Sequence, residues 1–224
     1  MQRKHRPGSR GADERLLVSA SPEELRRALD ALSPELPWAE LRDALRPVFV
    51  RRRPLPPGIE RPVTLTTPLG LQVALGADIG PAVMYVSPGM LETWSISADA
   101  AFDQAMANLR AAMAAERDAE LEYGTIGDVP TWWYQSRGGL ASGLLLIEDE
   151  LHRRYGAEPR LLVAPMRNLL IAAPFDADRA LMSWIRDDIA FEDPNGLDLP
   201  LFALVDGRLS IEGGGGVGRG VPVH

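Results

Sequence analysis

The chain has 224 residues, of which 46% are hydrophobic and 25% charged, as is ordinary for a soluble globular protein. It contains no cysteine, which excludes disulfides, thiolate metal sites and cysteine nucleophiles. Residues 1–62 hold 13 basic and 9 acidic residues, a net charge of +4, whereas residues 63–224 hold 11 basic and 22 acidic residues, a net charge of −11. Phosphate contacts dominate nucleic-acid affinity, so an acidic body is expected to bind nucleic acid poorly.

The first fifty residues predict a tail followed by a helical appendage. Residues 1–14 are polar and aperiodic, which is typical of a disordered tail. Ser21 and Glu24 have the spacing of a capping box at the start of a helix. The stretch from Trp38 to Leu45 has the apolar spacing of a second, short helix. We therefore assign residues 15–50 to a helical appendage.

A linker is predicted to separate this appendage from the main domain. Arg51, Arg52 and Arg53 are followed by a proline-rich stretch that favours extended geometry. We place the linker at residues 51–61 and the main domain at residues 62–212. The three arginines form a candidate basic patch for an acidic partner or for a weak nucleic-acid contact.

The main domain predicts an alternation of helices and paired strands. Residues 98–135, 140–173 and 177–211 each have the pattern of a helix followed by two strands. Strands joined by short turns pair antiparallel. We therefore expect an α+β fold, in which helices pack on a mostly antiparallel sheet built from repeated helix-strand-strand units, with the helical appendage added at the N-terminus. The glycine-rich residues 213–224 predict a second disordered tail.

Apolar stripes predict which side of each helix faces the core. The expected core residues are Phe102, Met106, Leu109 and Met113 in the first helix, Leu144, Ile147 and Leu151 in the second, and Leu181, Trp184, Ile185 and Ile189 in the third.

Several stretches of the main domain resemble a known bacterial family. They are Asp78 followed by VMYVSPGMLETW, the segment 138–142 before an apolar helix, RLLVAPMRNLLIAAP, and the closing LFALVDGRLSIE. These stretches resemble the YtpQ-like bacterial family, a domain of unknown function, over about residues 63–212. The resemblance implies a cytoplasmic bacterial protein without an established activity, so it supplies no active-site residue.

No catalytic constellation is recognisable in the sequence. The glycines at 213, 215 and 218 match a dinucleotide-binding fingerprint, but only six residues follow them, so a flexible tail is favoured. Ser142 lacks the spacing of a nucleophile elbow. His152 is the only histidine outside the tails, and its position four residues after Glu148 favours a surface helix residue. We expect no catalytic residue, no metal and no cofactor.

The aromatic run Trp132, Trp133 and Tyr134 is the most unusual cluster. In a strand, Trp132 and Tyr134 share one face and Trp133 takes the other. Packing in the core and under the N-terminal helices is the favoured interpretation, and a binding surface is the alternative. Arg167, in the turn between two apolar strands, either adds an anion contact to that surface or is a plain turn residue. These four residues are the candidate binding surface.

These patterns favour a non-catalytic protein-interaction or adaptor domain in the bacterial cytoplasm, with another protein as partner and no membrane segment. One alternative is a metal-dependent hydrolase that uses the acidic pairs at 187–188 and 192–193. The other is a weak nucleic-acid binder that uses the basic N-terminal part.

Overall fold

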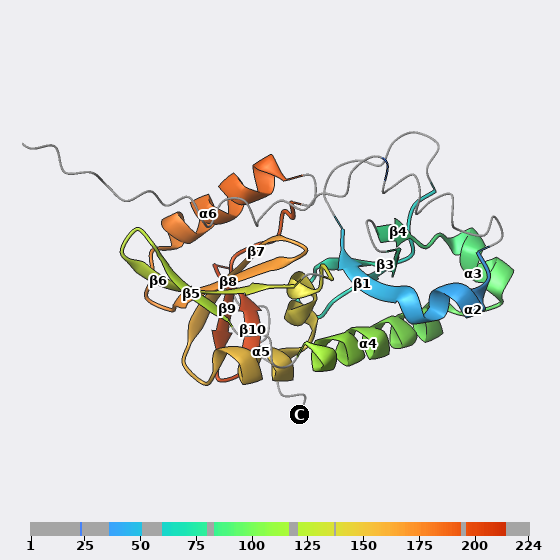
Figure 1. Cartoon of the computed structure of the whole chain (residues 1–224), viewed down its shortest axis with the longest axis horizontal. Helices are drawn as coiled ribbons and strands as arrows, with labels where there is room; N and C mark the ends of the chain where they lie inside the picture. Colours follow the sequence, from blue (N-terminus) through green and yellow to red (C-terminus); the bar gives the residue numbers. More distant parts are fainter. Residues whose placement is uncertain are drawn as a thin grey trace, which may run out of the picture.

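A computed structural model describes residue 23 and residues 36–50, 60–79, 83–116, 121–136, 138–193 and 196–213. The predicted N-terminal tail, the capping box at Ser21 and almost all of the predicted linker and glycine-rich tail lie outside these residues. In chain order (Figure 1) the elements are α2 (Trp38–Leu41), η1 (Arg42–Ala44), β1 (Leu45–Phe49), β2 (Thr64–Thr66), β3 (Gln72–Asp78), β4 (Val83–Tyr85), α3 (Pro88–Trp94), α4 (Ala98–Ala115), β5 (Glu122–Ile126), β6 (Val129–Gln135), η2 (Ala141–Leu146), α5 (Glu148–Tyr155), β7 (Arg160–Met166), β8 (Leu169–Pro174), α6 (Arg179–Glu192), β9 (Phe202–Val205) and β10 (Arg208–Ile211).

The strands form two antiparallel sheets. In the four-stranded sheet, β3 pairs with β1 along one edge and with β2 and β4 along the other. The six-stranded sheet has the order β10-β9-β7-β8-β6-β5. The two sheets lie side by side in Figure 1, with α4 below the four-stranded sheet. The predicted α+β class is confirmed, with two sheets in place of the single sheet expected.

Helices cover both faces of the six-stranded sheet. Leu162 and Ala164 of β7 pack into the core that contains η2 and α5, whereas Leu161 and Val163 pack into the core beneath α6. A strand covered on both sides needs apolar residues at successive positions, which explains the apolar sequences of β7 and β8. The helices of the three helix-strand-strand stretches therefore lie on different surfaces, since α4 packs on β1 and α5 and α6 take opposite faces of the larger sheet.

The long helix α4 covers the four-stranded sheet. The Ser97 side chain caps its start by accepting a hydrogen bond from the backbone N–H of Ala100. The predicted core stripe is confirmed, since Phe102, Leu109 and Met113 are buried and the partly buried Met106 packs against the same core. These residues belong to one apolar core that also includes residues of the six-stranded sheet.

The segment before the predicted linker differs from the expectation. The short helix predicted from Trp38 to Leu45 ends as η1, and Leu45 already starts strand β1, which pairs with β3. Asn108 of α4 fixes this junction by donating to the carbonyl oxygen atoms of Arg42 at 2.6 Å and Leu45 at 3.1 Å. The residues after Ala44, assigned to the appendage from sequence, are thus part of the sheet of the main domain.

Arg154 of α5 binds the end of α4 and a strand of the larger sheet. Its side chain is only 3% exposed and donates through Nη2 to the carbonyl oxygens of Met113 at 3.4 Å and Glu116 at 3.0 Å. Carbonyls at a helix C-terminus lack partners within the helix, and a cation there is favourable. Nε of Arg154 donates to Glu150 at 2.9 Å, and its guanidinium lies 4.2 Å from the ring centre of Tyr134 in β6.

Gly196 provides a test of the packing after α6. It forms a β-bridge with Met166, and a Cβ atom at this position would collide with the backbone carbonyl of Ala190. We expect Gly196→Ala to lower the free energy of unfolding by about 1–3 kcal/mol in urea denaturation, because backbone must move to relieve the overlap. Gly124→Ala in β5 is the control, since an added Cβ there meets no atom within 4 Å. Equal stability of the two variants would contradict this packing.

Candidate functional site

The predicted aromatic cluster lies on β6. Trp132 and Tyr134 pack against the core shared with α4, and Trp133 packs against the core beneath α6, as the strand alternation predicts. Tyr134 is fully buried, and its hydroxyl donates to Oε2 of Glu116 at 2.6 Å. Burial, followed by this hydrogen bond, raises the pKa of Tyr134 well above its usual range. Tyr134 is therefore a core residue and does not present a binding surface.

The two tryptophans of the cluster also have partners within the chain. The Arg160 guanidinium lies 3.8 Å from the ring centre of Trp132, and Tyr123 meets the same ring edge-on at 5.8 Å. Nε1 of Trp133 donates to Oγ1 of Thr131 at 2.7 Å. These contacts support the packing interpretation of the cluster. The predicted basic patch at residues 51–53 lies outside the described residues.

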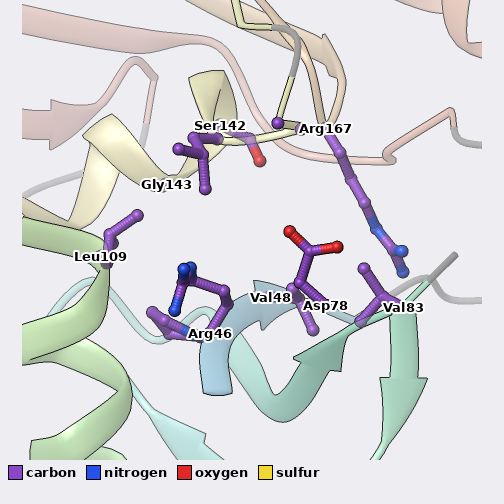
Figure 2. A pocket seen from close by; sticks show the side chains of 12 residues that line it. Arg46, Val48, Asp78, Val83, Leu109, Ser142, Gly143 and Arg167 are labelled. Carbon is purple, nitrogen blue, oxygen red and sulfur yellow. The ribbon is translucent and has the colours of Figure 1, made fainter. Parts of the chain in front are cut away.

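The fourth predicted residue, Arg167, lines a small hollow between the two sheets. This hollow has a volume of about 50 Å³. Arg46 of β1 and Asp78 at the end of β3 line one side, and Ser142 and Gly143 of η2 line another. Figure 2 shows Arg46 and Asp78 extending from the smaller sheet and Arg167 extending from the turn between β7 and β8. Residues far apart in sequence thus share one site.

The two arginines are only partly paired. Nη2 of Arg167 donates to the Tyr85 hydroxyl at 3.0 Å. Nη1 of Arg46 donates to the carbonyl oxygens of Asp43 at 2.9 Å and Leu45 at 2.7 Å. The Nε atoms of both arginines are buried and have no hydrogen-bond acceptor among the described residues. The site therefore contains two donors that lack acceptors. Each unpaired buried donor costs about 1–3 kcal/mol.

The charges around the hollow favour an anion. Burial lowers the pKa of Arg46, and the charges of Asp78 and then Asp43 oppose this effect. Among the described residues of the lining, two guanidinium groups and one carboxylate leave one positive charge in excess. From the sequence, Arg46 fell within the predicted helical appendage and was not a candidate site residue, and Asp78 was noted only within the family resemblance.

The outer side of α6 carries a second candidate surface. Trp184 is 59% exposed and Phe191 is 83% exposed, and their spacing of seven residues places them on the same helix face, two turns apart. The inner face holds the buried Met182 and Ile185. The prediction that Trp184 faces the core was wrong. Trp184 lies four residues before the charged Asp188, and residues four apart share one helix face. This spacing is the signal in the sequence that Trp184 lies on the outer face.

The acidic pairs of α6 do not form a metal site in the described part of the chain. Asp187 binds Nε of its neighbour Arg186 at 2.6 Å, and Asp193 is buried. No group of three histidine, aspartate or glutamate residues within the described ranges lies close enough to hold a metal ion. The hydrolase alternative therefore gains no support from these residues.

Comparisons with protein-family models, with curated proteins and with solved structures gave no match to this chain. The resemblance to the YtpQ-like family over residues 63–212 thus stays a prediction from sequence motifs. Among the helices that the structure describes, none combines the length and the hydropathy that a membrane span requires.

The burial of Tyr134 predicts that removal of its hydroxyl lowers stability more than the same change at an exposed tyrosine. Tyr134→Phe keeps the ring but removes the hydroxyl that donates to Glu116. We expect the free energy of unfolding to fall by about 1–2 kcal/mol, because a part-buried carboxylate loses a charge-assisted hydrogen bond. Tyr123→Phe is the control, since Tyr123 is 68% exposed, and its effect is expected within about 0.5 kcal/mol. Chemical denaturation followed by fluorescence measures both, and equal losses would refute the assignment.

Proposed function

We propose that this chain is a non-catalytic protein-interaction or adaptor domain that docks its partner on the outer face of α6. The observation that carries the proposal is the exposure of Trp184 and Phe191 on one face of a single helix. Single exposed apolar residues are common on soluble proteins. Two large aromatic side chains on the same helix face are typical of the residues that dominate binding energy in protein interfaces.

Charge indicates the kind of partner. The exposed Asp187 and Asp188 lie on the same outer side of α6 as the two aromatic residues. Arg186 is mostly covered, because its Nη1 reaches back to the carbonyl oxygen of Leu199 at 3.3 Å. An acidic border around an apolar centre complements a segment with apolar anchors flanked by lysine or arginine. We therefore assign the partner as a basic, amphipathic segment of another protein.

The helix is held rigidly, which favours binding. The Asp178 side chain caps the start of α6 by accepting a hydrogen bond from the backbone N–H of Ala180 at 2.8 Å. Arg179 in the first turn forms an ion pair with Glu212 at 3.0 Å. Met182 and Ile185 anchor the inner face in the core. A surface that is already ordered loses little conformational entropy when a partner binds.

The proposal predicts the composition of peptides that bind this face. Selection of a random peptide display library against the purified chain is expected to enrich sequences with aromatic or leucine anchors flanked by lysine and arginine. A synthetic peptide from that set should bind the Trp184→Ala/Phe191→Ala variant at least about tenfold more weakly, since each aromatic anchor contributes about 1 kcal/mol or more. Isothermal titration calorimetry measures both affinities.

Tyr123→Ala is the matched control, because the exposed fraction of Tyr123 lies between those of Trp184 and Phe191, but Tyr123 is on β5 of the six-stranded sheet. It should bind the selected peptide like the wild type. Asp187→Asn/Asp188→Asn should weaken binding and reduce its salt dependence, since the acidic border is removed. Enriched peptides without basic residues, or undiminished binding by the double aromatic variant, would argue against this function.

A further inference from the structure

The hollow between the sheets brings together charged side chains from both sheets. Arg46 and Asp78 come from the four-stranded sheet, and Arg167 comes from the turn between two strands of the six-stranded sheet. In Figure 2 the Asp78 carboxylate points into the space between the Arg46 and Arg167 side chains, below Ser142 and Gly143. Helix α6 packs through its inner face on a different core, so this site is separate from the docking surface on its outer face.

The chemistry of the arginines selects the ligand class. The buried Nε atoms of Arg46 and Arg167 lack acceptors among the described residues, while their terminal nitrogens already hold Tyr85 and backbone oxygens. A guanidinium presents its N–H groups in a planar fork that matches the oxygens of a carboxylate or phosphate. An oxyanion therefore supplies the acceptors that these donors lack.

The size of the hollow limits the ligand to a single small group. One water needs about 10–15 Å³ of such space, so about 50 Å³ holds roughly three to five water-sized atoms. That number matches a phosphate or carboxylate group and is too small for a nucleotide base or a sugar ring. Val48, Val83 and Leu109 in the walls lower the local dielectric, which strengthens the interaction between an anion and the two arginines.

We propose that this hollow is a binding site for one oxyanion group, either inorganic phosphate or a carboxylate, held between Arg46 and Arg167. Asp78 offsets part of the positive charge and so sets a moderate affinity. Because the two arginines belong to different sheets, a bound oxyanion stabilises the junction between the sheets.

The test measures binding of defined anions to the full chain. Inorganic phosphate and acetate are titrated separately at constant ionic strength, with chloride as reference, by isothermal titration calorimetry and by thermal unfolding. We expect saturable binding of one equivalent of phosphate or acetate, together with a rise in Tm. The anion with the higher affinity shows whether the natural ligand carries a tetrahedral phosphate or a planar carboxylate.

Variants show whether the anion occupies the hollow. Arg167→Met should weaken binding at least about tenfold, because a charge-assisted hydrogen-bonding group is lost. Arg167→Lys, which keeps the charge but not the planar fork, should give an intermediate affinity. Asp78→Asn should bind several-fold more tightly, because a like charge is removed. Arg208→Met is the control, since Arg208 is exposed on β10 and does not line the hollow.

Three results would contradict the proposal that the hollow binds an oxyanion. The first is the absence of saturable binding by either anion below about 10 mM. The second is equal affinity in wild type, Arg167→Met and Arg208→Met, which indicates general surface binding. The third is weaker binding of the anion by Asp78→Asn, which contradicts repulsion between the Asp78 carboxylate and the bound anion. Circular dichroism checks the fold of each variant. If Arg167→Met does not fold, the affinities of Arg167→Lys and Asp78→Asn are compared with the wild type instead.

Discussion

The contact between Arg154, the end of α4 and the ring of Tyr134 links the two sheets through a single polar group. Helix α4 covers the four-stranded sheet, and Tyr134 lies on β6 of the six-stranded sheet. One nearly buried guanidinium binds both and also pairs with Glu150, whose pKa is held below its usual range by hydrogen bonds from Arg153 and Arg154. A buried charge whose partners were removed would cost several kcal/mol, so this geometry is strongly constrained.

The two proposed sites depend on this junction to different degrees. The hollow lies between the sheets, so the distance between Arg46 and Arg167 follows from how the sheets are held together. The outer face of α6 lies on the far side of the larger sheet, over a separate apolar core. We expect the anion site to be sensitive to the junction and the docking surface to be largely independent of it.

Local patterns in the sequence were enough to predict much of the fold. The hairpin signal Asp206-Gly207 joins β9 and β10, and both residues have the positive φ of a tight hairpin turn. Strand β1 was missed because Arg46 and Pro47 are unusual strand residues. Proline is tolerated there because β1 forms the edge of its sheet.

The sites were less accessible to sequence reasoning. Trp184 lies one residue before the buried Ile185, about 100° around the helix, so an apolar count alone placed it on the wrong face. The hollow joins residues 46, 78 and 167, and only the pairing of distant strands brings them together. The run Trp132–Tyr134 attracted attention by composition, yet its contacts are within the chain.

Native-state hydrogen exchange of wild type and Arg154→Met tests most directly whether Arg154 couples the two sheets. Our account predicts that amides in the last turn of α4 and in β6 lose protection together in the variant, while amides of α6 are less affected. A loss confined to α5, or unchanged protection in both α4 and β6, would contradict the central role of Arg154.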